Sequence, residues 1–363
     1  MKTNLTSMFA GQDARKTAQR VLHGALLITL AGVTLTGASL AADSKPNIGI
    51  LVPGPNAYFD PWHAAAADAS KAFNINATFQ VPPTDAFNLT QENALLDSLV
   101  ARSTVGFALF PGDPNGTNAE EGKLAKRGIP TVNINGCTID PSPALFCISA
   151  DIYKAARYQA EELIKAIGGT GPIALLASQL TDPNTQLRIK AVKDAVAATD
   201  GKVTLTQVVA DIDTPQLSPP AVNALLASQG TTLAGAMSTS YNPSIAMAVA
   251  LTDNPQFRHI KFVGADGAPQ VMDAVKQGII TGTLFQNTYG MAYAGAYAVT
   301  KAARDKCKVA DDAPFSASLQ TKRVLESQVQ LVTKDNIAQF PLASIPSDTA
   351  RLIDLLDHKV FKC

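Results

Sequence analysis

The sequence predicts an α/β protein built as two doubly wound parallel-sheet lobes. Short apolar, β-branched runs alternate along the chain with stretches of helical period, and turn signals such as Pro53-Gly54-Pro55 separate them. The alternation breaks between residues 128 and 150, where two strands follow each other with no helix between them. A (β/α)₈ barrel is the main alternative at 363 residues. Two lobes joined by several crossing strands fit this break better than a barrel does.

The individual elements follow from apolar runs and their spacing. Buried parallel strands are expected at Asn47–Val52, Val105–Phe110, Thr131–Ile134, Ile173–Ala177, Val203–Val209, Leu233–Met237, Ile260–Val263 and Thr281–Phe285. Two further strands are expected at Phe146–Ser149 and Gln328–Thr333. Helices are expected at Asn93–Arg102, Asn118–Arg127, Ile152–Ile167, Gln186–Ala198, Ser244–Leu251, Pro269–Gln277 and Tyr289–Ala303.

The first 42 residues have the pattern of a cleavable secretory signal peptide. Four basic side chains precede an uncharged, largely apolar run from Val21 to Leu35, and small residues lead up to Ala42. The basic residues are Lys2, Arg15, Lys16 and Arg20. An uncleaved membrane anchor is the alternative, but the polar Asp43 favours cleavage. We therefore expect a protein exported to the periplasm.

Composition excludes several classes of function. The chain has 30 basic and 30 acidic residues, and removal of residues 1–42 would leave 26 and 29. This balance argues against binding of nucleic acid or anionic lipid. The sequence contains no G-x-S-x-G, no G-x-x-x-x-G-K-[ST] and no H-E-x-x-H, and its four histidines suggest no metal cluster. We expect neither catalysis nor a cofactor.

The four cysteines can form two disulfides in an oxidising compartment. Sequence alone allows three pairings. Cys137–Cys147 is the local choice, and its short loop would contribute about 3 kcal/mol in the chain-entropy model. Cys307–Cys363 would then hold the C-terminal tail. Four buried thiols are the alternative.

A series of short motifs carries a resemblance to a known family. Asn47–Pro53 leads into Asn56-Ala57-Tyr58-Phe59, and further landmarks follow in the same order as in that family. These landmarks are Gly128-Ile129-Pro130, Ile148–Asp151, Val263–Gly267 and Gly282–Gln286. From residue 46 to about 335 the chain resembles the periplasmic sugar-binding proteins of ABC transporters, with the type I fold of the ribose-binding-like branch.

The resemblance implies a set of ligand-binding residues. Tyr58 and Phe59 would stack on the apolar face of a sugar ring, with Asn56 beside them. The polar residues that would hydrogen-bond the ligand are Asn135, Gln186, Asn242, Asp266 and Gln286. Ribose-type proteins commonly place arginine where this chain has Gly136 and Gln186, although Arg188 lies nearby in sequence. The loss of two guanidinium groups favours a small neutral sugar, a polyol or a similar hydroxylated ligand.

The resemblance also implies a domain organisation. One lobe would comprise residues 43–149 and 288–325, and the other residues 150–287 and 326–345. Residues 346–363 would form a C-terminal tail. Ligand binding would close the lobes about three crossings, near Ser149–Asp151, Gln286–Thr288 and Leu325–Gln328.

The function implied is that of the periplasmic solute-binding component of an ABC importer, which performs no chemistry. Its partners would be a carbohydrate or polyol and the membrane permease, with no nucleic acid, and the chain is expected to act as a monomer. An alternative is a periplasmic sensing subunit that presents a small molecule to a receptor kinase or chemoreceptor.

Overall fold

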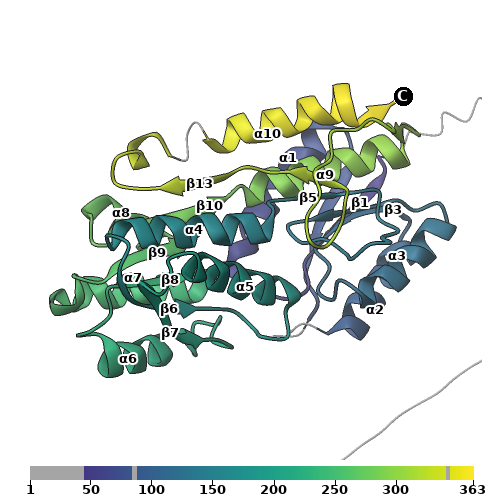
Figure 1. Cartoon of the computed structure of the whole chain (residues 1–363). Helices are drawn as coiled ribbons and strands as arrows, with labels where there is room; N and C mark the ends of the chain where they lie inside the picture. The colour runs from purple at the N-terminus through teal and green to yellow at the C-terminus, as the bar shows by residue number, and fades with distance from the viewer. Residues whose placement is uncertain (1–44, 84–87, 341–343) are drawn as a thin grey trace, which may run out of the picture. The chain divides into compact units, whose positions relative to one another are not determined.

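The computed structural model of the chain describes residues 45–83, 88–340 and 344–363 (Figure 1). The signal peptide predicted for residues 1–42 lies outside the described residues. None of the helices in the described ranges is both long and apolar enough to span a bilayer. The described strands form two six-stranded sheets and a small two-stranded one, which confirms two doubly wound sheets and excludes the single barrel.

The first large sheet, sheet A, has the strand order β12-β5-β4-β3-β1-β2, and all its strands are parallel. Its strands are β1 (Asn47–Leu51), β2 (Asn76–Gln80), β3 (Thr104–Leu109), β4 (Thr131–Ile134), β5 (Cys147–Ser149) and β12 (Val324–Glu326). The helices of this part of the chain are α1 (Pro61–Ala72), α2 (Leu89–Ala101), α3 (Gly116–Lys126) and α9 (Thr288–Ala303). The short helix η1 (Ala57–Phe59) follows β1. The hydrophobic core between sheet A and its helices contains Ile50, Trp62 and Ile134.

The second large sheet, sheet B, has the order β13-β10-β9-β8-β6-β7, with only β13 antiparallel to its neighbour. Its strands are β6 (Gly171–Leu176), β7 (Val203–Val209), β8 (Gly235–Ser238), β9 (Lys261–Ala265), β10 (Gly282–Gln286) and β13 (Val329–Val332). Its helices are α4 (Ile152–Ala166), α5 (Pro183–Ala197), α6 (Ser218–Gln229), α7 (Tyr241–Asp253) and α8 (Pro269–Gln277), with η2 at Pro255–Phe257.

Strand β2 and helices α1 and α6 are among the elements that the sequence did not predict, each for an identifiable reason. Strand β2 lies at the edge of sheet A and its side chains are exposed or half-buried, so it has no continuous apolar run. Helix α1 buries Trp62 and three alanines, which give a weak apolar pattern. Helix α6 begins with Ser218-Pro219-Pro220, a sequence typical of a loop but compatible with the first turn of a helix.

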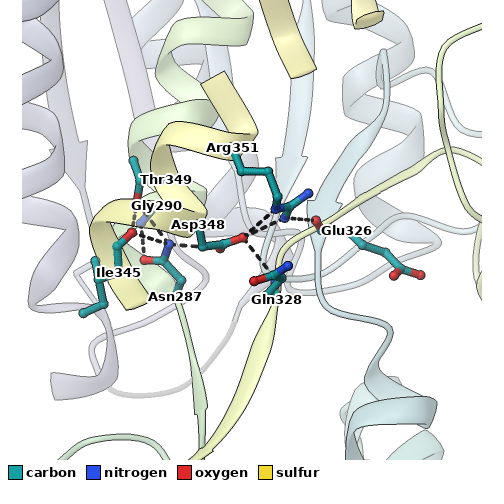
Figure 2. A network of polar contacts seen from close by, with 8 residues as sticks. All are labelled: Asn287, Gly290, Glu326, Gln328, Ile345, Asp348, Thr349 and Arg351. Carbon is teal, nitrogen blue, oxygen red and sulfur yellow. Dashed lines mark hydrogen bonds and ion pairs between the residues drawn. The ribbon is translucent and has the colours of Figure 1, made fainter. Parts of the chain in front are cut away.

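The chain passes between the two sheets in the segments β5–α4, β10–α9 and β12–β13. Figure 2 shows a polar network that joins two of these crossings to helix α10 (Ser344–Leu355). The buried carboxylate of Asp348 accepts hydrogen bonds from Nδ2 of Asn287 (3.0 Å) and the backbone amide of Gln328 (3.4 Å). Arg351 donates to Asp348 (2.6 Å) and to the backbone carbonyl of Glu326 (2.7 Å). Helix α10 is therefore bonded directly to both crossings.

Residues 346–363, predicted as a tail, are packed against the sheet A core. In Figure 1 helix α10 runs along the side of the molecule that carries α9, and the two helices are in contact. Leu352 and Phe361 belong to the same hydrophobic core as Trp62. The chain continues through η4 (Leu356–Val360) into β14 (Phe361–Lys362), which pairs antiparallel with β11 (Lys308–Val309). The segment η3 (Ile337–Gln339) precedes α10.

Both predicted disulfides are present. Cys137 is bonded to Cys147, with the Cα atoms 5.5 Å apart, and Cys307 is bonded to Cys363. The first bond links the loop after β4 to β5. The second links the segment after α9 to the last residue of the sequence, and so holds the C-terminal segment on sheet A.

Candidate functional site

Polar side chains gather where the parallel strands of both sheets end. Asn135 follows β4, Asp266 follows β9, and Gln286 is the last residue of β10. Asn135 and Asp266 have φ angles of 67° and 64°. Asn and Asp tolerate this left-handed region better than other residues with a Cβ, so the chain can turn sharply at these strand ends. In open α/β sheets such strand ends are the usual place for a ligand.

On the sheet A side, the predicted residues already have protein partners. The Tyr58 hydroxyl donates to Oδ1 of Asn135 (2.6 Å). The side chain of Asn56 accepts from the backbone amide of Tyr58 (3.0 Å) and so caps η1. Phe59 is buried, with ring centroids 5.0 Å from Tyr58 and 5.1 Å from Trp62. Tyr58 is therefore held from three sides, and Phe59 acts as a core residue behind it.

On the sheet B side, several buried polar atoms have no hydrogen-bond partner. Asp266 is 7% exposed, and its Oδ1 is unpartnered, as is Oε1 of Gln286. The hydroxyls of Thr239 and Ser240, just after β8, are also buried and unpartnered. Burying a polar group without a partner costs about 1–3 kcal/mol, and native proteins seldom do so without a reason. This cluster is the strongest indication of where a ligand binds.

The electrostatics connect the two sides. Burial raises the pKa of the Asp266 carboxyl to about 7; the nearby Arg188 guanidinium opposes this rise and Asp213 adds to it. Burial also raises the pKa of Tyr58 well above its usual value, and the charge of Asp266 raises it further. Tyr241 has a pKa raised by burial and by Asp266. Both phenols therefore keep their protons at neutral pH.

Direct contacts also join the sheet A side to residues that follow strands of sheet B. The rings of Tyr58 and Tyr241 meet edge-on, with centroids 6.4 Å apart. The side-chain amide of Gln320 donates to Oδ1 of Asn184 (2.9 Å). A Cβ on Gly136 would lie 2.3 Å from the Phe110 ring and 3.2 Å from Nδ2 of Asn184. Only glycine permits this approach, which explains why no arginine stands at that position.

Two of the predicted residues lie apart from this group. Gln186 is exposed, and its side chain donates to the backbone carbonyl of Leu180 (2.6 Å). Asn242 donates from both its backbone amide and its Nδ2 to Oδ1 of Asp213 (3.0 Å each). Asn242 thus positions Asp213, which in turn acts on Asp266 electrostatically.

Asn184, Asp213 and Tyr241 are not among the residues that the sequence predicts for the site, and Arg188 is predicted only as a partial substitute for the missing arginines. A signal for two of them existed in the sequence. Asn184 and Arg188 are four residues apart on α5 and so share a face of the helix, whereas Gln186 between them points elsewhere. Among the described residues, no group of three or more His, Cys, Asp or Glu side chains is placed to hold a metal ion.

Solved structures with this fold are numerous. A solute-binding protein from Burkholderia graminis in complex with D-arabinose has a TM-score of 0.71 at 18% identity, covering 82% of this chain and 98% of that one. A periplasmic solute-binding protein from Actinobacillus succinogenes with bound D-allose has the same score and identity, covering 82% and 100%. A solute-binding protein from Bacillus halodurans with bound myo-inositol has a TM-score of 0.70 at 16% identity, covering 82% and 98%.

At these identities the similarity establishes the fold. The family follows from the sequence itself, because residues 48–307 match the family model of the periplasmic binding protein domain. That match includes both sheets up to α9 and all the strand ends described above. With its two sheets, its crossings and this match over most of its length, the chain belongs to the periplasmic binding protein family.

Proposed function

We propose that this protein is the solute-binding component of an ABC importer and binds a small neutral sugar or polyol between its two sheets. The observation that carries the proposal is the buried side chain of Asp266. Its Oδ1 is unpartnered, as is Oε1 of Gln286, whose side chain hydrogen-bonds the Asp266 carboxyl. Both oxygens are acceptors, and vicinal hydroxyl groups supply the donors that they need. In this role the ligand is released unchanged.

The charges near the site favour a neutral ligand. Asp266 lies within electrostatic reach of the Arg188 guanidinium, which lowers the pKa of its carboxyl, and of Asp213, which raises it. An anionic ligand would add negative charge to a region where the carboxylates already balance or exceed the positive charge. A neutral ligand needs no charge partner, and its ring C–H groups can meet the faces of Tyr58 and Tyr241.

The structural relatives support the chemical class. Their bound ligands are a pentose, a hexose and a cyclic polyol: D-arabinose, D-allose and myo-inositol. All three are small, neutral and hydroxylated. The site residues proposed here are Tyr58, Asn135, Asp266 and Gln286, with Asn56, Phe59 and Asn242 as supporting residues. Gln186 would act only after a change of rotamer.

The organisation proposed for this role is a two-lobe clamp. Residues 43–149 with 288–325 would form one lobe, and residues 150–287 with 326–345 the other, closing about the three crossings. Residues 1–42 would direct export and be removed, and the mature protein would act as a monomer in the periplasm. The closed form would deliver its ligand to a membrane permease.

Thermal unfolding of the exported chain against a panel of pentoses, hexoses, deoxysugars and polyols tests the proposal. At a thousand times Kd, a ligand adds about 4 kcal/mol to the unfolding free energy, which shifts the midpoint by several degrees. We expect a selective shift that Asp266→Ala removes and Asp253→Ala, an exposed acid on α7, leaves in place. A flat panel would move the ligand outside carbohydrates and polyols. Consumption of the ligand, followed by NMR, would contradict a pure binding role.

A further inference from the structure

A groove of about 910 Å³ lies between helices α1, α9 and α10. None of the strand-end residues described above lines it. Its apolar surface includes Pro61 of α1, Tyr289 and Tyr293 of α9, and Ile345 and Ile353 of α10. The family match ends at residue 307, so the wall formed by α10 belongs to the part of the chain beyond that match.

The charged residues that line the groove are predominantly acidic. Among the described residues, the lining includes Asp68, Asp354 and Asp357, and His358 is its sole basic side chain, with no lysine or arginine. Lys301 pairs with Asp357 (3.1 Å) from outside the lining. Asp354 lies 3.6 Å from Nε2 of His358, but its side chain is 69% exposed, so its carboxylate is accessible at the rim. The groove therefore complements a positive charge.

The aromatic wall also suits a flat cation. The rings of Tyr289 and Tyr293 are stacked, 13° from parallel with centroids 5.8 Å apart. The Tyr289 hydroxyl donates to Oδ2 of Asp68 (2.9 Å), and burial together with this contact raises the pKa of Tyr289 to about 12. The phenol thus stays protonated and its ring orientation is fixed. An arginine guanidinium can stack on such a ring while it hydrogen-bonds a carboxylate in the ring plane, which the ammonium of lysine cannot do.

We propose that this groove is a docking site for an arginine-bearing peptide segment of a protein partner. The guanidinium stacks on the tyrosine pair and bonds Asp354 or Asp68, while apolar neighbours in the segment cover Ile345 and Ile353. The side chains of Asp354 and His358 at the rim are 69% and 70% exposed, so this part of the groove faces solvent. An open groove accommodates an extended segment better than it encloses a small molecule.

The occupant of the groove would also contact the crossing between β10 and α9. Thr349 and Ile345 line the groove, and both bond Nδ2 of Asn287 in the network of Figure 2, at 3.1 and 3.3 Å. A partner seated here therefore touches residues that are directly bonded to the crossing. The docking site goes beyond the sugar-binding role, and its test does not depend on any sugar.

The experiment is a selection of random nine-residue peptides on the exported chain. Selected peptides are then measured by fluorescence anisotropy, each beside a copy with citrulline in place of arginine. Citrulline keeps the shape of the side chain and removes its charge. We expect arginine to be enriched, at least tenfold weaker binding of the citrulline copies, and weaker binding at higher salt.

Variants locate the binding on the molecule. Asp354→Asn is an exposed, isosteric change and should weaken binding about threefold to tenfold. Tyr293→Leu should weaken it more, and Asp253→Asn, the same charge change on α7, should leave it unchanged. Circular dichroism checks the fold of Tyr293→Leu, because that ring also packs on Phe73.

Four outcomes would overturn the proposal. They are a selection without binders, equal binding of arginine and citrulline peptides, binding that survives both groove variants, and free arginine binding as tightly as the peptides. The last of these would assign the groove to a small organic cation.

Discussion

The two sides of the candidate site differ in how far their polar groups are satisfied. On the sheet A side, Tyr58 donates to Asn135, and Asn56 caps the helix that carries Tyr58. On the sheet B side, Asp266 and Gln286 are buried or half-buried and keep unpartnered oxygens. At the strand ends, the polar groups on the sheet A side bond one another, whereas those on the sheet B side leave acceptors that a ligand could use.

This difference assigns a separate task to each side. A wall whose groups bond one another is rigid before the ligand arrives, so it offers shape and an aromatic face at little cost in ordering. A wall with unpartnered acceptors discriminates strongly between ligands, because an analogue lacking the matching donor leaves those groups unpaired. We therefore expect sheet B to set which hydroxyl pattern is bound, and sheet A to set which ring fits.

The largest effect is expected for Asp266→Ala. It removes charge-assisted acceptors, each worth about 1.5–3 kcal/mol, so the affinity for the sugar should fall at least 100-fold. Isothermal titration calorimetry measures this loss, and a normal melting curve would show that the fold is intact. Unchanged affinity would contradict this assignment, since the Asp266 carboxylate would then make no contribution to ligand recognition.

The pH dependence of the unfolding free energy tests whether Asp266 is a buried acid, independently of its proposed contact with the ligand. Burial raises the pKa of Asp266 and of Glu121, a buried acid on α3, to about 7. In the unfolded chain these acids ionise near pH 4, so the folded state binds more protons between about pH 4 and 7. Stability should therefore fall as pH rises through this range, by up to about 1.4 kcal/mol per pH unit for each group.

Denaturant titrations of Asp266→Asn and Glu121→Gln from pH 4 to 8 test this point. Each substitution should make the unfolding free energy depend less steeply on pH, and only Asp266→Asn should change the affinity for the sugar. Glu121 already accepts from Asn133 (2.6 Å), as expected of a satisfied group on the sheet A side. A slope unaltered in Asp266→Asn would contradict the raised pKa of that carboxyl.

A moderate effect is expected for Asp348→Asn, which acts on the crossings that both sides share. Its two carboxylate oxygens accept from Asn287, Gln328 and Arg351, and an amide can keep only one acceptor. Part of the network is lost in either orientation of the amide. Because the network bonds two crossings to α10, we expect its loss to favour other arrangements of the two sheets and to raise Kd about tenfold, or by about 1.4 kcal/mol.

Calorimetry measures this change too, with Asp253→Asn as the matched control. Small-angle scattering should show a larger radius of gyration for Asp348→Asn at a subsaturating sugar concentration. If both quantities match the unmodified protein, the network is a structural contact without influence on closure.

The smallest effect is expected for Tyr58→Phe. The substitution keeps the ring and removes the hydroxyl that donates to Asn135. Because this bond lies within the protein, its loss should change the affinity less than about threefold, whereas Tyr58→Ala should reduce it further. A loss of 100-fold in Tyr58→Phe would mean that the hydroxyl bonds the ligand directly, and the two sides would then share the task of recognition.

Much of the fold was predictable because local patterns agree with it. The bounds of strand β7 and helix α8 coincide with the predicted ones, because each segment keeps one secondary-structure pattern between clear turn signals. The site was predictable in part. Asp266 follows a buried strand and precedes a glycine, so a strand end was evident from the sequence.

The other site residues could not be predicted, because they depend on which face of a helix packs toward the site and on contacts between residues far apart in the sequence. The spacing of Asn184, Gln186 and Arg188 places the first and last on one face, but only the packing of α5 shows which face meets the site. Tyr241 could not be distinguished from an ordinary helix start, because its partner Tyr58 is 183 positions away. The role of α10 likewise rests on contacts with Asn287 and Gln328 that no local pattern encodes.

Trp62 is the one tryptophan of the sequence, fully buried on the sheet A side behind Phe59. Its emission therefore reports on a single side of the molecule. A sugar that stacks on Tyr58 would change the Trp62 emission through Phe59. A ligand held only by Asp266 and Gln286 would leave that emission unchanged. Intrinsic fluorescence thus gives a label-free means of resolving in time which side engages first.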